Sequence, residues 1–168
     1  FYPEQGSERI VEILFTYPES VKTLSDRRQA LQRQAEGYTA PLQGQTGQKA
    51  VSSIFQLLRQ QVPSLSEGST AYDALVDGQA DSEGMALAFQ LLCQYLKVES
   101  TVVQGTVNGV PHFWNVVTFD DGASRHVDTT REEGLLLDDS QLSALGYTWD
   151  QNEVPTCTPA PQETQQDP

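Results

Sequence analysis

The stretch of residues 82–97 restricts the possible folds of this chain more than any other segment. Its apolar residues recur at helical spacing on two faces, the first made by Met85, Phe89, Leu92 and Leu96 and the second by Leu87, Leu91 and Tyr95. A helix that is apolar around most of its circumference must be buried on several sides. Asp81 and Ser82, at its start, are residue types that cap helix N-termini. We therefore predict a buried central helix that the rest of the domain surrounds.

Three strands are predicted directly after this helix, over residues 100–107, 110–119 and 123–130. Asn108-Gly109 joins the first two strands and is a strong hairpin signal, because both residue types tolerate a positive φ. Asp120-Asp121-Gly122 joins the second strand to the third. Strands that follow one another through such short turns form an antiparallel meander. The predicted fold class is therefore α+β, with the central helix packed on the meander and a helical N-terminal half.

The remaining segments outline a single domain over residues 1–153. Residues 7–44 form a predicted N-terminal helical part with a loop at 37–44, and residues 45–150 form the core. Within the core, apolar spacing predicts a helix at 51–62, a short helix at 71–77 and another that begins at Asp139. Residues 154–168 contain four prolines and a polar run rich in Gln and Thr. Such a segment cannot bury enough apolar surface to fold, so it is predicted to be a disordered tail or linker.

The charge and composition of the chain exclude several classes of partner. It has 23 Asp and Glu residues against 10 Lys and Arg residues, a formal net charge of −13. This charge argues against binding to nucleic acid or to an anionic membrane surface. No apolar stretch approaches the roughly 20 residues of a membrane helix, so no membrane span is predicted. Two cysteines and two histidines are too few for a disulfide scaffold or a multi-His metal site. We expect no metal and no cofactor, and a monomer.

Three polar residues mark the ends of the predicted elements. Ser82 begins the central helix, His112 begins the second strand and Asp128 ends the third. The segments around them are AYDAL at 71–75, GQADSEGMA at 78–86, HFWN at 112–115, HVDTT at 126–130 and GYTWD at 146–150. In this order and spacing the segments resemble the transglutaminase-like superfamily, including its bacterial members, whose core is a cysteine-protease-like (papain-like) fold. The resemblance covers residues 45–150.

The chain departs from that family at the nucleophile. The family places a catalytic Cys, within a Cys-Glu-Gly pattern, where this chain has Ser82. Family members use that Cys, with a His and an Asp, to attack a glutamine side-chain amide or a peptide bond. The resemblance implies that His112 is the base and that Asp128 orients it. The same resemblance therefore predicts triad positions at Ser82, His112 and Asp128 that lack the sulfur.

The replacement of Cys by Ser leaves three explanations open. A Cys thiol near a helix N-terminus and a His forms a thiolate readily, whereas a Ser hydroxyl needs a base that removes its proton during the attack. The site can therefore be catalytically silent, or it can be a Ser-dependent hydrolase. A Ser introduced by an experimenter into a Cys enzyme is the third explanation. Asp81 counts against it, because an acidic neighbour would oppose thiolate formation.

The turn between the second and third strands decides whether the triad can form. If Asp120-Asp121-Gly122 is a three-residue loop with Gly122 in the left-handed region, Trp114 lies opposite Asp128. His112 then shares a face of the sheet with Trp114 and Asp128. A two-residue loop would put His112 and Asp128 on opposite faces. The triad hypothesis therefore requires the three-residue loop.

Several other residues are weaker candidates for the site. Trp114, Tyr72 and Gln79 are candidate substrate-binding residues, although core packing explains Trp114 equally well. His126 is predicted to be a surface or partly buried strand residue without a role. The acidic pairs Asp120-Asp121, Glu132-Glu133 and Asp138-Asp139 match no calcium-loop spacing and are predicted to be solvated turns and caps.

Neither cysteine can take over the role of the missing nucleophile. Cys93 follows Ser82 on the same helix at a distance of about 16 Å along the axis, too far to reach His112. It is predicted to be a buried small apolar residue. Cys157 is predicted to be incidental in the tail, with a disulfide to Cys93 as an open alternative.

These observations favour an exported transglutaminase-like domain, located outside the cell or at its surface, that is a pseudoenzyme. It would bind a peptide, an amine-bearing polymer or a component of the cell envelope, or serve as a scaffold. The expectation of export rests on a chain that starts at Phe1 without Met. The alternatives are a Ser82–His112–Asp128 hydrolase or acyltransferase acting on amide or peptide bonds, and a purely structural spacer domain.

Overall fold

The structure is a computed structural model that describes residues 20–63 and 65–159. Its helical half contains α1 (Val21–Thr39), a short 3-10 turn (Ala40–Leu42), α2 (Gly47–Gln61), a wide π-type turn (Asp73–Asp77) and α3 (Ser82–Tyr95). The other half contains β1 (Glu99–Val107), β2 (Val110–Thr118), β3 (Ser124–Val127), β4 (Leu135–Leu137), α4 (Asp139–Ala144) and β5 (Tyr147–Trp149). Residues 7–19 of the predicted N-terminal helical part, and residues 160–168 at the end of the predicted tail, lie outside the described residues.

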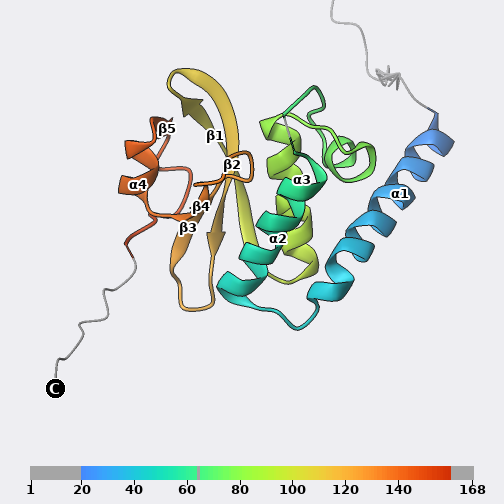
Figure 1. Cartoon of the computed structure of the whole chain (residues 1–168), viewed down its shortest axis with the longest axis horizontal. Coiled ribbons are helices and arrows are strands. Elements are labelled where there is room, and N and C mark those ends of the chain that lie inside the picture. The colour runs from blue at the N-terminus through green and yellow to red at the C-terminus, as the bar shows by residue number, and fades with distance from the viewer. Residues whose placement is uncertain (1–19, 64, 160–168) are drawn as a thin grey trace, which may run out of the picture.

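The strands form one antiparallel sheet in the order β4-β3-β2-β1-β5. Its centre is the predicted meander β1–β2–β3, and the short strands β4 and β5 are added at its two edges. Figure 1 shows α1, α2 and α3 together on one side of this sheet and α4 on the other. The predicted α+β class, with a helical half packed on an antiparallel meander, is confirmed.

Side chains of β2 alternate between two apolar cores, because successive residues of a strand point to opposite faces. Val117 belongs to the core that the sheet shares with α2 and α3. Trp114 and Val116 belong to the second core, which Leu142 of α4 completes. His112 lies two residues before Trp114 in β2 and so shares the face of the second core.

The central helix is buried as predicted. Met85, Phe89, Leu92 and Cys93 of α3 are all fully buried in the first core. Both predicted turns are also confirmed. Asn108 and Gly109 have φ angles of 52° and 82°, which is a two-residue hairpin turn. Gly122 has a φ of 82°, and the Phe119 N–H donates to the Ala123 carbonyl, so the second turn has three residues.

The structure corrects two boundaries. The loop predicted at 37–44 begins later, because α1 continues to Thr39, whose buried hydroxyl donates to the Ala35 carbonyl at 2.7 Å. The segment predicted as disordered from Val154 is anchored as far as it is described. Cys157 is 1% exposed, and its backbone carbonyl and N–H pair with the N–H and carboxylate of Asp139 at 2.9 and 3.2 Å. Composition alone could not reveal this anchor.

Candidate functional site

A His–Asp pair lies where β2 begins and β3 ends. His112 Nε2 is 2.7 Å from Asp128 Oδ2, and the side chains are 12% and 0% exposed. The register Asn115↔Val127 places Trp114 opposite Asp128, so His112 is diagonal to Asp128 on one face. The three-residue loop at Gly122 is what sets this register. The predicted pairing of His112 with Asp128 is therefore present in the structure.

Four donors surround the Asp128 carboxylate. Oδ2 accepts from His112 and from the Tyr147 hydroxyl, and Oδ1 accepts from the Thr130 N–H at 2.8 Å and the Thr130 hydroxyl at 2.6 Å. Burial by itself raises the pKa of Asp128, but the hydrogen bonds and charge of His112, with those of Thr130 and Tyr147, outweigh it and hold the pKa below its usual value. The carboxylate is therefore ionised at neutral pH and accepts the Nε2 proton of His112. This leaves Nδ1 of a neutral His112 as the basic nitrogen.

Tyr147 and Thr130 are site residues that sequence reasoning did not single out by role. Burial, followed by the charge of Asp128, raises the pKa of Tyr147 well above its usual value, so its hydroxyl remains a donor. The Arg131 guanidinium lies 5.5 Å from the centre of the Tyr147 ring. Both residues lie inside segments that carry the family resemblance, HVDTT and GYTWD. That context was the only available signal, because β5 reaches the site through tertiary pairing with β1.

Ser82 approaches β2 from α3 without completing the triad. Its Oγ accepts a hydrogen bond from the Phe113 backbone N–H at 3.3 Å. Ser82 Oγ makes no other hydrogen bond with the described residues, and in particular none with the His112 ring. The structure thus brings Ser82 beside the residue that follows His112 and joins only His112 and Asp128 directly.

Of the two candidate cap residues at the start of α3, Asp81 is the one that caps the helix. Asp81 is the N-cap of α3, and its carboxylate accepts from the Gly84 N–H at 3.0 Å. The Ser69 hydroxyl donates to the other oxygen of Asp81 at 2.6 Å. Ser82 is the first residue inside the helix. The Ser82 hydroxyl therefore does not cap the helix, and the Asp81 carboxylate lies one residue before it.

Trp114 lies under the site and does not line it. Its side chain is 1% exposed, and its ring is stacked with His112 at a centroid distance of 6.4 Å. Tyr147 and Trp149 both pack edge-on against it, at 5.2 and 6.1 Å. The ring is part of the second core, as the alternative of core packing predicted, and a role in substrate binding stays a prediction.

The other two candidate substrate-binding residues are not joined to the pair. Tyr72 is partly buried, and its ring carries the Arg27 guanidinium at 4.5 Å from the centroid. Gln79 is exposed, and its backbone N–H donates to the Asp73 carbonyl at 3.1 Å. In the described part of the chain, neither side chain makes a hydrogen bond to Ser82, His112 or Asp128. Their predicted roles in binding stay predictions.

His126 is more deeply buried than predicted. It is 0% exposed, accepts from the Trp114 indole N–H through Nδ1 at 3.1 Å, and faces Asp139 Oδ1 through Nε2 at 2.9 Å. Burial lowers the pKa of His126, against the opposing effect of Asp139. The ring is therefore neutral and carries its proton on Nε2. Its polar contacts explain why a strand histidine can be buried at all.

The same geometry argues against a metal at this point. His126, Asp139 and Cys157 offer ligand atoms within 4.8 Å of one another. A metal on Nε2 would require the ring proton on Nδ1, where the Trp114 N–H already donates. The donor set therefore does not fit a metal ion.

Both cysteines are free, and burial raises the pKa of each thiol to about 12, so neither is a nucleophile at neutral pH.

A small cavity of about 70 Å³ lies beside the His–Asp pair. It is lined by Met85, Thr129 and Thr130 and by Arg59, Val62, Pro63 and Leu65. Thr130 also holds Asp128, so the cavity adjoins the site directly. It has room for one or two water molecules or a short side chain.

In the described residues, no helix is both long enough and apolar enough to cross a membrane.

Comparison with known proteins identifies the fold. No protein-family model matches the sequence, and no curated protein matches it. A solved structure of a transglutaminase superposes with a TM-score of 0.53 and 16% sequence identity, over 69% of this chain and 34% of that one. A candidate cysteine protease from Cytophaga hutchinsonii gives a TM-score of 0.48 and 16% identity, over 73% of this chain and 42% of that one.

The chain therefore has a transglutaminase-like fold, as its sequence motifs predicted. It spans about a third of the length of the transglutaminase that it resembles. At this identity the likeness concerns the fold alone, and the activity of this chain must be argued from its own residues.

Proposed function

We propose that this chain is a transglutaminase-like domain that binds a peptide or an amine-bearing ligand at Ser82, His112 and Asp128 without catalysing its reaction. The observation that carries the proposal is the hydrogen bond between the Phe113 N–H and Ser82 Oγ. A serine nucleophile must pass its proton to a base within about 2.6–3.2 Å during attack. Ser82 Oγ accepts from the Phe113 N–H, and among the described residues no hydrogen bond joins the Ser82 hydroxyl to the His112 ring.

Two further features support inactivity. Asp81 holds a carboxylate one residue before Ser82, and negative charge next to a nucleophile opposes the oxyanion that must develop. A hydroxyl in a site shaped for sulfur also lacks the ready ionisation of a thiol. The retained His112–Asp128 pair gives such a site fixed polar groups for recognition. The net charge of −13 favours ligands that carry amines, although salt screens the long-range part of this attraction.

The completeness of the His112–Asp128 pair favours one alternative, a Ser-dependent hydrolase or acyltransferase. The pair has its orienting carboxylate, two additional donors from Thr130 and one from Tyr147. Catalytic hydrogen bonds often tighten only when substrate is bound. A small rotation of Ser82 toward Nδ1 of His112 would then complete a Ser–His–Asp triad.

Covalent labelling of the full chain separates the proposal from its alternative. Wild type and Ser82→Ala are treated with a fluorophosphonate and analysed by intact mass. We expect no adduct on either protein. An adduct on wild type that is lost in Ser82→Ala would establish the hydrolase and overturn the proposal of inactivity.

Binding is measured on the same proteins with two probes, a dansylated diamine and a blocked Gln-Gly dipeptide. We expect saturable binding of at least one probe to wild type, and its loss in Ser82→Trp, which fills the site. Ser25→Trp on α1, an exposed position, is the matched control and should bind as wild type does. Absence of binding of both probes to wild type would contradict the proposed function.

The same proposal places the domain outside the cell or at its surface, where it would meet its ligand. This location rests on the sequence-based expectation of export and is tested by fractionation of the source cells with an antibody against the domain. Recovery of the protein from the cytoplasm alone would refute this location.

A further inference from the structure

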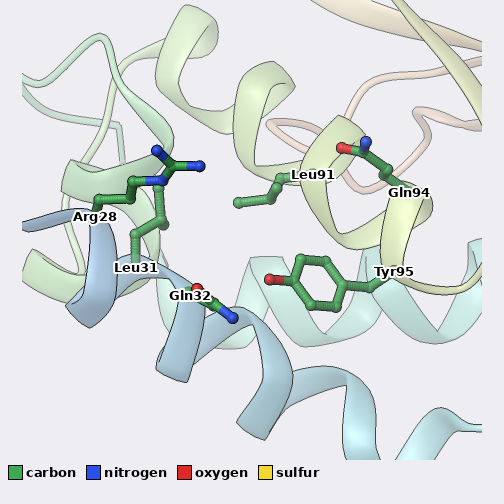
Figure 2. Close-up of a pocket in the computed structure, with 6 residues that line it drawn as sticks. All are labelled: Arg28, Leu31, Gln32, Leu91, Gln94 and Tyr95. Atoms are coloured by element: carbon green, nitrogen blue, oxygen red, sulfur yellow. The ribbon is translucent and has the colours of Figure 1, made fainter. Parts of the chain in front are cut away.

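A groove of about 460 Å³ separates α1 from α3 on the helical side of the molecule. Figure 2 shows Leu91 pointing across it toward α1, with Leu31 on the facing helix. The remaining lining residues are polar and come from both helices: Arg28, Gln32, Gln94 and Tyr95. An apolar floor with a few polar groups around it, at this volume, is typical of ligand-binding pockets.

The polar groups around the groove are available to a ligand. Within the described residues, no carboxylate lies at ion-pair distance from the Arg28 guanidinium. The Tyr95 hydroxyl likewise has no hydrogen-bond partner among those residues. Gln32, in contrast, donates to Glu36 at 2.8 Å. Arg28 and Tyr95 therefore present donors without a partner among the described residues at the edge of an apolar floor.

The apolar floor continues along α1 beyond the groove. Val21 and Leu24 are 84% and 46% exposed. Residues 21, 24, 28 and 31 fall on one face of a helix, because their spacing alternates between three and four. At about 1.5 Å of rise per residue, the resulting stripe is about 15 Å long. A partner that covers Leu31 would therefore also reach Leu24 and Val21.

The helix that carries this stripe is net basic in an acidic chain. α1 holds four basic residues, Lys22, Arg27, Arg28 and Arg33, and two acidic ones, Asp26 and Glu36, so its formal charge is +2 in a chain with a net charge of −13. Lys22 pairs with Asp26 at 3.8 Å. Of the basic residues, Arg28 is the one that lines the groove. Arg33 lies about 140° away around the helix, at 100° per residue. The acidic character of the chain is thus interrupted where the apolar stripe is exposed.

We propose that the α1–α3 groove binds an acidic amphipathic helix of a partner protein. Apolar side chains of the partner at positions i, i+3, i+4 and i+7 enter between Leu31 and Leu91 and extend over Leu24 and Val21. A carboxylate beside them pairs with Arg28, and the Tyr95 hydroxyl donates to a second acceptor. A helix fits because the groove is bounded by two helices and the exposed stripe has the length of about three turns.

This surface is separate from the Ser82 site. Leu91 follows Ser82 on α3 by about 13 Å along the helix axis. The groove residues take no part in the hydrogen bonds of His112 and Asp128. The inference therefore stands whether or not the proposed function of the Ser82 site is correct.

Fluorescence anisotropy with two labelled peptides tests the proposal on the full chain. The probe is a 16-residue peptide with leucines at i, i+3, i+4 and i+7 and glutamates elsewhere. The comparison peptide has the same composition with the leucines dispersed around the helix. We expect Arg28→Glu to weaken binding of the probe by about tenfold or more, the loss of one charge-assisted contact. Arg33→Glu, with the same charge change on another face, should bind within about twofold of wild type.

Three results would overturn the proposal. They are an absence of binding to wild type, equal binding of the two peptides, and equal weakening by Arg28→Glu and Arg33→Glu, which would indicate charge attraction alone. Circular dichroism of both variants checks that the fold is retained. Leu24→Glu, at an exposed position, provides a second apolar test that does not depend on Arg28 and should also weaken binding.

Discussion

Replacement of Asp128 by asparagine is the sharpest test of how the site is held together. The change preserves the shape of the side chain and removes its charge. The oxygen of the new amide can still accept from Thr130, as Asp128 does through Oδ1. Its NH₂ group, however, would face His112 and Tyr147, both of which donate to Oδ2. Two charge-assisted hydrogen bonds are therefore lost.

The expected magnitude follows from this count of bonds. Each hydrogen bond to a charged group contributes about 1.5–3 kcal/mol. His112 can move its proton to Nδ1 and accept from the new amide, and the Tyr147 hydroxyl can rotate, which restores about 1 kcal/mol for each neutral bond. The free energy of unfolding should therefore fall by about 1–4 kcal/mol in Asp128→Asn.

The assay is urea unfolding followed by tryptophan fluorescence. The chain has two tryptophans, Trp114 and Trp149, whose rings lie 6.1 Å apart next to the site, so the signal reports on this region. Asp121→Asn is the matched control. Its carboxylate is exposed and accepts one hydrogen bond from the Ala123 N–H at 2.9 Å. The control should stay within about 0.5 kcal/mol of wild type.

A loss of stability in Asp128→Asn no larger than that in Asp121→Asn would refute the reasoning. It would mean that the four contacts of Asp128 contribute no net stability beyond those of an exposed turn. A change in the urea dependence without a change in midpoint would point instead to an altered unfolded state.

Three further predictions follow from the same geometry. The pKa of Asp128 is lowered in the folded protein, so the stability that its charge contributes is complete above the unfolded pKa of about 3.9 and is lost as the pH falls through the folded pKa. The difference in unfolding free energy between wild type and Asp128→Asn should therefore be smaller at pH 3 than at pH 7, and an equal difference would contradict this. Gly105→Ala should destabilise the protein by at least about 2 kcal/mol, because the new Cβ would collide with the Thr148 carbonyl. Gly37→Ala lies in a helix, has no atom within 4 Å of the new Cβ, and should stabilise the protein by about 0.5–1 kcal/mol; thermal unfolding that ranks the two variants the other way would count against the packing described. Asp139→Asn removes a charge that opposes the effect of burial on the His126 pKa. That pKa should therefore fall further in an NMR titration, and an unchanged titration would show that Asp139 does not act on the ring.

The local signals in the sequence were strong enough to fix the central part of the fold. The apolar circumference of residues 82–97 predicted the buried α3, and Asn108-Gly109 predicted the first hairpin. The turn at Gly122 allowed a conditional statement about register, and the structure selects its three-residue form. These features depend on neighbouring residues, which is why periodicity and turn chemistry suffice for them.

The site was only partly predictable because its residues come from distant elements. Tyr147 reaches Asp128 only because β5 pairs with β1, and His126 is buried only because Trp114 and Asp139 satisfy both ring nitrogens. The anchoring of Cys157 likewise depends on Asp139 across the fold. The sequence alone predicted a surface or partly buried His126 and a disordered tail around Cys157, since a sequence does not show which hydrogen-bond partner will be present.

The sequence by itself determined the class of the fold and the order of its central elements, because those depend on local periodicity and turns. The resemblance of its motifs to a known family pointed to three chemically capable side chains. The tertiary structure decided which of these side chains meet. It joined His112 to Asp128 through strand register and directed the Ser82 hydroxyl to the Phe113 backbone. Hydrogen bonds act over about 3 Å, and separations of that size are set only when helix and sheet are packed together.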